Sequence, residues 1–454
     1  MQQRAFRAWG TASILLGLIG LQGCGGGGDN RTEPAHAAAD ATSRSSELQT
    51  AYRVVFTDVF AGGAGDAAYS VVDASRGRVI DAQGRFAATY GAPVGAPQAI
   101  LAPPVQRMSS FEDRSFARGV SPNGIFIGTS YSLEQVNRAF ATFTQTAETY
   151  YMPALSSADF VSTTGLVGGH ACADGEGEPQ SCGGDLRPYA VHWQPVTGEL
   201  SPHPGFLATW MNDGGRMLGY QELPDGTKRL STVGPDGVVA DLGFEPEAGF
   251  TAVPRFISGD GAVFLNVADD PFNPRREMAV VLIDSCVAVT VGRVSERPAL
   301  CSRTECVERT RFTAFSATGH AVGEHAWLYR DEDGNWQFAV ETGFHWSAKD
   351  GSTAITDAGK GLPFGVNAHG AVIVGGPAVR TPSSQDGRAE PFLWKKGAGA
   401  MALRTTLFPD PEELQPEDVL EVLAIGDGGE LLVWFGNPAD LQSWLRLFTP
   451  AKGS

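Results

Sequence analysis

The stretch from Phe364 to Gly376, which reads FGVNAHGAVIVGG, decides the fold. It predicts an apolar strand, a polar turn at 367–370 and a second apolar strand, because Asn and Gly favour the backbone conformations of tight turns. After a loop, the stretch 391–403 (PFLWKKGAGAMAL) predicts an aromatic-rich strand, a Gly/Lys turn and another apolar strand. Four short strands in a unit of this size are typical of one β-propeller blade.

The first half of this unit, which we call the turn box, recurs along the chain. It consists of an apolar strand, a polar pair, a glycine and a second apolar strand. Seven copies are found, at 119–128, 160–169, 210–219, 256–266, 314–323, 365–375 and 424–434. Aromatic-rich stretches such as YAVHWQPVTGEL at 189–200 lie between them. The strand after each turn is mostly a continuous apolar run, which predicts sheets buried on both faces. The glycine that closes many copies predicts close approach of the next blade's backbone.

Both ends of the chain predict additional strands. The segments YRVVFTDVF at 52–60 and AAYSVVDASRGRVI at 67–80 precede the first turn box, and DLQSWLRLFTP at 440–450 follows the last. We expect these segments to share one blade and so to close the ring. The sequence therefore predicts an all-β fold, a single β-propeller of about seven four-stranded blades over residues 51–454, with six or eight blades as alternatives.

The repeats resemble a known family. GVNAHGAVIVGG with PFLWKKGAGAMAL, WMNDGGRMLGY with VVADLG, and YAVHWQPVTGEL are similar to the HAF repeats of bacterial exported proteins. The box asparagine is kept at Asn212 and Asn367, and the tryptophan at Trp193, Trp346 and Trp394. The resemblance covers most of 85–450. It implies an exported, propeller-like repeat protein, and it implies neither a reaction nor a ligand.

The amino-terminal segment is predicted to be a targeting signal rather than part of the fold. Arg4 and Arg7 precede an apolar core at 12–21 that is too short to span a bilayer as a helix. The segment ends Leu-Gln-Gly-Cys24, which resembles a bacterial lipobox apart from its central glutamine. The resemblance implies cleavage before Cys24 and lipidation of that residue, with an ordinary signal peptide as the alternative. Gly25 follows instead of an aspartate, which favours the outer membrane.

The leader divides the chain into three parts. Residues 1–23 are the predicted lipoprotein signal peptide, 24–50 a lipidated, flexible and disordered tether rich in Gly and polar residues, and 51–454 the propeller. We expect the protein in the bacterial cell envelope, on the periplasmic or surface face of the outer membrane and held there by lipid alone.

Charge narrows the range of partners. The full chain carries a net charge of −17, and removing the leader removes two arginines and no acid, which leaves −19. A surface this acidic argues against nucleic acid as a partner. It is compatible with solubility, with cations and with basic protein surfaces.

Five cysteines remain after Cys24, and an exported chain meets an oxidising compartment. Cys172 and Cys182 bracket a polar loop and predict a disulfide. Cys301 with Cys306 would close a tight loop, although Cys286 is an alternative partner for either of them. One cysteine must remain unpaired. The spacings do not favour haem or zinc, and we expect no cofactor.

The sequence contains no GxSxG, HExxH or GxxxxGK(S/T) motif and no GxGxxG between a strand and a helix, which disfavours common hydrolase, NTPase and nucleotide chemistries, and no catalytic residue is predicted. His320, His325 and His345 would bind a metal only if their strands aligned, and structural or solvent-facing roles are the alternative. The Asp331–Asn335 stretch resembles part of a calcium loop, but Thr342 stands where the last ligand would be. It therefore predicts a hairpin turn first, as do Asp269 and Asp270.

These observations favour a non-enzymatic cell-envelope lipoprotein whose propeller is a binding or scaffold module for a protein or a glycan. The alternatives are a propeller enzyme acting on polysaccharide or peptidoglycan, with acids on one face, and a cation-dependent adhesin suggested by the acidity and the Asp-rich turns.

Overall fold

The computed structural model describes residues 51–61, 68–71, 78–91, 97–107, 114–131, 137–152, 156–173, 179–180, 188–283, 287–302, 304–355, 361–375, 390–410, 412–415, 418–437 and 442–451. All of them belong to the compact unit Ser43–Ser454. The predicted signal peptide, the tether and Cys24 lie outside the described residues, and so do Cys182 and Cys286.

The regular secondary structure of the described residues is almost entirely β-strand, and the strands form four-stranded groups that we number I to VIII along the chain. Group I contains β2 (Ala68–Val71), β3 (Phe86–Gly91), β4 (Gln98–Ala102) and β5 (Gln106–Arg107), and group II contains β6 (Arg114–Val120), β7 (Ile125–Tyr131), β8 (Asn137–Phe143) and β9 (Glu148–Tyr151). Group III contains β10 (Ser156–Val161), β11 (Val167–Ala173), β13 (Pro188–Gln194) and β14 (Glu199–His203), with the short β12 (Pro179–Gln180) beside β11. Group IV contains β15 (Phe206–Met211), β16 (Met217–Glu222), β17 (Lys228–Val233) and β18 (Val239–Asp241).

The second half of the chain continues the series. Group V contains β19 (Thr251–Ile257), β20 (Val263–Ala268), β21 (Glu277–Ile283) and β22 (Val287–Thr290), and group VI contains β23 (Cys306–Phe315), β24 (Ala321–Arg330), β25 (Trp336–Ser347) and β26 (Gly351–Ile355). Group VII contains β27 (Pro363–Val366), β28 (Ala371–Val374), β29 (Phe392–Lys395) and β30 (Gly399–Ala402). Group VIII contains β31 (Val419–Ile425), β32 (Leu431–Asn437), β33 (Gln442–Pro450) and β1 (Tyr52–Ala61). The short helices η1 (Ala299–Ser302) and α1 (Leu403–Leu407) complete the described elements.

Within each group, neighbouring strands pair antiparallel, so short hairpin turns can connect them. Groups V and VI are one hydrogen-bonded sheet, because β21 and β23 share a single parallel pair at Glu277 and Arg309. Group VIII combines both ends of the described chain, since β1 pairs with β33 from Tyr52–Pro450 to Ala61–Gln442.

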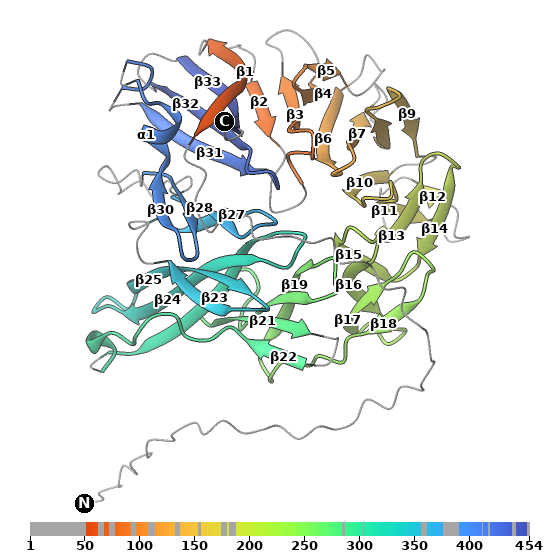
Figure 1. Ribbon diagram of the computed structural model, residues 1–454. Helices are drawn as coiled ribbons and strands as arrows, with labels where there is room; N and C mark the ends of the chain where they lie inside the picture. The colour runs from red at the N-terminus through yellow and green to blue at the C-terminus, as the bar shows by residue number, and fades with distance from the viewer. Residues whose placement is uncertain are drawn as a thin grey trace, which may run out of the picture. The chain divides into compact units, whose positions relative to one another are not determined.

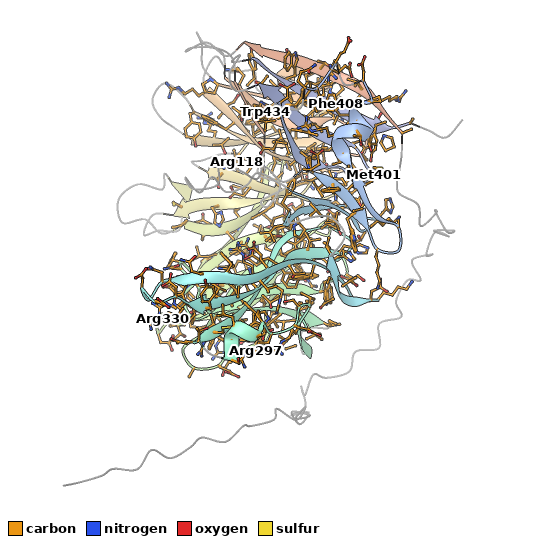
Figure 2. All side chains as sticks on the ribbon, turned by 90° about the vertical axis from the view of Figure 1, so that its left-hand side faces the viewer. Arg118, Arg297, Arg330, Met401, Phe408 and Trp434 are labelled. Carbon is orange, nitrogen blue, oxygen red and sulfur yellow. A yellow bond between two sulfur atoms is a disulfide. The ribbon has the colours of Figure 1, made fainter. Side chains whose placement is uncertain are left out.

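The groups follow one another around a common centre (Figure 1), and apolar clusters join every neighbouring pair. One cluster combines Phe86 of group I, Phe126 of group II and Leu447 of group VIII. Six further clusters join II to III, III to IV, IV to V, V to VI, VI to VII and VII to VIII. In the view turned by 90°, side chains lie in the spaces between the sheets (Figure 2). A single sheet cannot bury both of its faces alone. This closed series of apolar contacts between neighbouring sheets therefore holds the β-propeller together.

The predicted end segments behave differently from one another. The segment 52–60 lies in β1 and shares a group with the carboxy-terminal strand, as predicted. The prediction that 67–80 joins the same group is wrong, because β2 pairs with β3 instead. Group I thus has its own turn, in which Ile80 bridges to Phe86 across residues 81–85.

The closing glycines serve their own sheet rather than the next one. A Cβ on Gly219 would stand 2.0 Å from the carbonyl oxygen of Leu207, in the first strand of the same group. Gly128, Gly169 and Gly323 meet the equivalent carbonyl at 2.4, 1.8 and 2.0 Å. The expected contact with the next blade's backbone is therefore wrong at these positions, and the bulge described below is the cause.

Two structural predictions concern cysteines and membranes. Cys301 and Cys306 form a disulfide, as the sequence suggested. Cys172 is also disulfide-bonded, and its pairing with Cys182 stays a prediction. Among the described residues, no helix has the length and apolar character needed to cross a bilayer.

Candidate functional site

Each group places one tight turn between its first and second strands, and the eight turns share one hydrogen-bond pattern. We call the residue that opens each turn the turn residue; these are Asp81, Ser121, Ser162, Asn212, Ser258, Ser316, Asn367 and Gly426. Its backbone N–H donates to the carbonyl four residues later, at 2.8–3.0 Å, and the glycine three residues later has φ between 71° and 92°. In six groups its side-chain oxygen also accepts the N–H four residues later. Asp, Ser and Asn are suited to this because they replace a backbone acceptor in tight turns.

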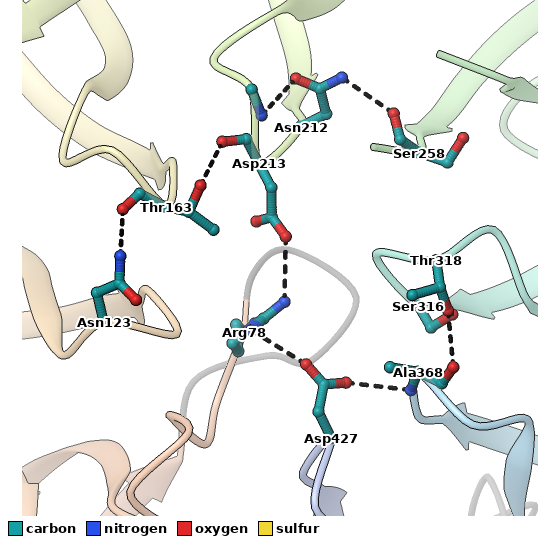
Figure 3. A network of polar contacts seen from close by, with 11 residues as sticks. Arg78, Asn123, Thr163, Asn212, Asp213, Ser258, Ser316, Thr318, Ala368 and Asp427 are labelled. Carbon is teal, nitrogen blue, oxygen red and sulfur yellow. Dashed lines mark hydrogen bonds and ion pairs between the residues drawn. The ribbon is translucent and has the colours of Figure 1, made fainter. Parts of the chain in front are cut away.

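Polar contacts connect each turn to the next and form a belt, part of which is shown in Figure 3. The contacts from group I to group V are Ala82 N to Pro122 O, Asn123 Nδ2 to Thr163 O, Thr163 Oγ1 to Asp213 O, and Asn212 Nδ2 to Ser258 O. The contacts from group V to group VIII are Gly259 N to Ala317 O, Thr318 Oγ1 to Ala368 O, and Ala368 N to Asp427 Oδ1. An ion pair between Asp427 and Arg78 returns the belt to group I. The turns are thus linked around one mouth.

A second ring lies three residues before each turn residue. The first strand shifts register at this place in groups II to VIII, which leaves one bulged residue in each. These residues, with Arg78 at the equivalent place in group I, form the bulge ring: Arg78, Arg118, Asp159, Thr209, Arg255, Thr313, Phe364 and Leu423. Bulges re-aim side chains and are enriched near functional sites. The members of this ring occupy the same backbone position in their groups, but their side chains differ in charge, polarity and size.

The first strands of groups II to VIII, together with Arg78 and Val79 of group I, line a central cavity of about 130 Å³. One side of its wall is aromatic: Phe160, Trp210, Phe256, Phe315 and Phe364 come from five consecutive groups. Phe256 and Phe315 stack with centroids 4.9 Å apart, and Trp210 lies 5.0 Å from Phe256. The cavity is large enough to hold more than one water molecule. Its size suits one inserted side chain rather than a large ligand.

Three charged side chains meet at the cavity's turn-lined mouth. The guanidinium of Arg78 lies 3.0 Å from Asp427 Oδ2 and 3.5 Å from Asp213 Oδ2 (Figure 3). Asp427 belongs to the neighbouring group VIII, whereas Asp213 belongs to group IV, so Arg78 reaches across the mouth. Burial raises the pKa of Asp213; Arg78 lowers it, and Asp427 raises it further. One arginine therefore serves two carboxylates.

A separate pair of side chains lies within group III. Asp159, which lines the cavity, accepts hydrogen bonds from Ser157 Oγ at 2.7 Å and pairs with His170 Nδ1 at 2.8 Å. Burial alone would raise the pKa of Asp159, but His170, Ser157 and the charge of Arg118 hold it below its ordinary value. The Nε atom of Arg118 is buried and has no hydrogen-bond partner.

The three histidines singled out in the sequence do not meet at one point. His320 Nδ1 lies 3.0 Å from His345 Nε2, but His325 faces Ser295 Oγ at 2.8 Å and Glu308 Oε1 at 3.0 Å. Burial, followed by the charge of His320, lowers the pKa of His345 to about 4. A second histidine pair joins His192 and His203 at 2.7 Å. In the part of the chain that the structure describes, no three His, Cys, Asp or Glu side chains are grouped to hold a metal ion.

The acidic stretches form turns, as their first interpretation predicted. Asp331 accepts the N–H of Asn335 at 2.7 Å and closes the hairpin between β24 and β25. Asp269 Oδ1 accepts the N–H groups of Asp270, Arg275 and Arg276 in the loop before β21.

The sequence did not indicate the mouth residues Arg78, Asp213 and Asp427. Asp213 and Asp427 directly follow turn residues, so a position-by-position alignment of the turn boxes would have placed them at the mouth. Arg78 required recognition of the eighth turn, whose Asp81 and Gly84 have the same spacing as Ser121 and Gly124. Nothing local indicates that residues 135 positions apart form an ion pair.

No protein-family model and no curated protein sequence matches this chain. Among solved structures, a prolyl endopeptidase is similar at 10% identity with a TM-score of 0.41, over 86% of this chain and 55% of that one. A puromycin-hydrolysing peptidase of Mycobacterium tuberculosis shows 12% identity and a TM-score of 0.39, over 86% and 61%. A fucose-recognising lectin of Aleuria aurantia, a six-bladed β-propeller, shows 11% identity and a TM-score of 0.26, over 63% and 93%. This chain thus spans about half the length of the first of these proteins.

Proposed function

We propose that this chain is a lipid-anchored cell-envelope protein whose propeller binds a protein or a glycan at its central mouth without catalysing a reaction. The observation that carries the proposal is the central cavity, which has an aromatic wall and a mouth formed by Arg78, Asp213 and Asp427. A few convergent polar groups above an apolar wall are typical of recognition sites.

We assign eight blades to this propeller, one to each of groups I to VIII. The support is the eightfold turn pattern and the apolar cluster at every neighbouring interface. Seven blades would require groups V and VI to act as one blade, although among the described residues a single parallel strand pair, Glu277–Arg309, joins their sheets. Blade VIII would close the ring with β1, which follows the tether directly.

The anchor in this proposal is a lipid on Cys24, with the protein at the outer membrane. Its support is the lipobox-like sequence alone. Replacing Cys24 by alanine in cells should move the protein from the membrane fraction to the soluble fraction. Membrane retention of the Cys24→Ala variant would contradict lipid anchoring and leave the binding proposal unaffected.

Crosslinking in intact cells, followed by recovery of the protein and mass spectrometry, tests the binding role. Phe364→Gln changes the cavity wall, whereas Phe338→Gln changes a phenylalanine that is 52% exposed and lies outside the cavity lining. We expect one dominant envelope partner or glycan fragment with the wild type and with Phe338→Gln, and its loss with Phe364→Gln. Melting curves of both variants establish that they fold. Equal capture by a folded Phe364→Gln variant would contradict binding at this site.

One observation supports a second candidate, an enzyme acting on polysaccharide or peptidoglycan. Asp159 orients His170 through Nδ1, which is how a carboxylate positions a histidine for proton transfer. Incubation of purified protein with peptidoglycan sacculi would test it. Release of soluble fragments by the wild type, lost in Asp159→Asn, would establish this candidate, and no release would eliminate it for this substrate.

A further inference from the structure

We propose that the ligand enters the mouth with a basic side chain, whose guanidinium or ammonium group replaces Arg78 between Asp213 and Asp427. The ligand would be a protein segment that carries an accessible arginine or lysine. This inference rests on the proposed function and names the chemistry that the same site recognises.

The chain's own guanidinium already shows what the two carboxylates hold. Arg78 lies between Asp213 and Asp427, which come from groups on different sides of the mouth. The three side chains are 22%, 32% and 39% exposed, respectively, so a group outside the protein can reach the carboxylates. Arg78 therefore occupies the site as an internal stand-in for the ligand.

The charge at the mouth favours a cation held between the two carboxylates. With both aspartates ionised, one guanidinium leaves a net charge of −1. Asp427 Oδ1 already accepts the N–H of Ala368, whereas among the described residues the contact made by Asp427 Oδ2 and by Asp213 Oδ2 at this mouth is with Arg78. Burial disfavours the ionised form of Asp213. A closer cation would relieve that penalty, and the net charge of −17 would attract basic segments from a distance.

Displacing Arg78 costs little. Ion pairs between partly exposed side chains contribute only about 0–1 kcal/mol, because water and salt compensate for their loss. An incoming lysine or arginine also brings an aliphatic stem, which can lie along apolar surface while its charged end remains at the carboxylates. Trp210 lies three residues before Asp213 and belongs to the aromatic wall below the mouth. The wall and the carboxylates thus suit the two ends of one basic side chain.

Isothermal titration of the purified full-length protein in detergent tests this inference. The probe is the peptide acetyl-Gly-Arg-Gly-amide, and the matched control peptide carries citrulline, which has nearly the same shape as arginine but no charge. We expect the arginine peptide to bind and the citrulline peptide to bind at least about tenfold more weakly, since the charge-assisted contacts are lost. A lysine peptide distinguishes an ammonium from a guanidinium preference.

Three variants separate displacement from simple surface attraction. Arg78→Gln removes the internal competitor, so the arginine peptide should bind about tenfold more tightly. Asp213→Asn should weaken binding by about tenfold or more. Arg229→Gln is the matched control, because Arg229 pairs with Asp241 in an exposed ion pair outside the cavity lining, and it should change nothing.

Two results would overturn the inference: equal binding of the arginine and citrulline peptides, or an Arg78→Gln variant with unchanged or weaker affinity. If Phe364→Gln nevertheless abolishes partner capture, the binding proposal stands and only the basic-ligand inference fails. If capture is also insensitive to Phe364→Gln, both fail.

Discussion

The turn residues and the bulge ring lie three positions apart on the same strands and differ in chemical variety. The turn residues are Asp, Ser, Asn or Gly in every group, and they repeat one set of hydrogen bonds. The bulge ring contains three arginines, one aspartate, two threonines, one phenylalanine and one leucine. The backbone requires a small polar residue or glycine at the turn, but it requires only a bulge three residues earlier. The first ring therefore serves the fold, and the second ring is free to carry recognition.

Acidification should change the free energy of unfolding more than any of the substitutions below. It acts through two histidine pairs that lie beside turns. His192 Nε2 lies 2.7 Å from the carbonyl oxygen of Gly215, and His345 Nε2 lies 3.4 Å from where a Cβ on Gly370 would stand, so each pair packs against the next group's turn. Burial is the main cause that lowers the pKa of His203 and His345 from 6.5 to about 4. Above pH 6.5 both the folded and the unfolded states are neutral. Below it the unfolded state gains a proton that the folded state does not, until about pH 4.

The free energy of unfolding should therefore fall between pH 6.5 and pH 4, by about 3 kcal/mol for each of these two histidines. Urea unfolding at a series of pH values measures this change. His203→Gln can still donate to His192 but does not titrate, so its slope in this window should be smaller than that of the wild type. If the free energy of unfolding fell equally steeply with pH in both proteins, His203 would not be a cause of the acid sensitivity.

The second prediction compares two glycines. Gly219→Ala would push a Cβ against the Leu207 carbonyl, so we expect a loss of about 3 kcal/mol, at the upper end for overpacking. Gly226 has φ +81° but open space around it, so alanine there should cost only about 1 kcal/mol of backbone strain. Thermal unfolding of the two variants measures the difference. Equal losses would show that the bulge does not force the glycine.

The sequence predicted seven of the eight turns, because each turn depends only on the residues within it. A polar residue followed three positions later by glycine is visible in six copies, and Gly426 takes the place of the polar residue in a seventh. The eighth copy, at Asp81 and Gly84, was missed because the segment before it was assigned to the last blade. The bulge ring was not predicted, since a register shift depends on pairing with the next strand. The contact between Arg78 and Asp213 could not be predicted, because it depends on closure of the whole ring.

A third prediction compares the two rings directly within group IV. Asn212 accepts hydrogen bonds from Gly214 and Arg216 and donates one to Ser258. Since Asn212 is buried, Asn212→Ala should cost about 2 kcal/mol by leaving these groups without partners. Thr209 is exposed and donates one hydrogen bond to the Leu218 carbonyl, so Thr209→Ala should cost less than about 1 kcal/mol. Similar losses in urea unfolding would mean that the bulge ring, too, serves mainly the fold.

The smallest effect on stability is expected at Arg78. It is a member of the bulge ring and connects group I to groups IV and VIII by ion pairs at the mouth. Its pairs are partly exposed, so Arg78→Gln should lower the free energy of unfolding by less than about 1 kcal/mol, about as much as Arg229→Gln at an exposed pair. A loss near that of Asn212→Ala would instead make Arg78 part of the structural belt. If Arg78 contributes little to folding but reaches across the mouth, its main role is in determining which ligand binds there.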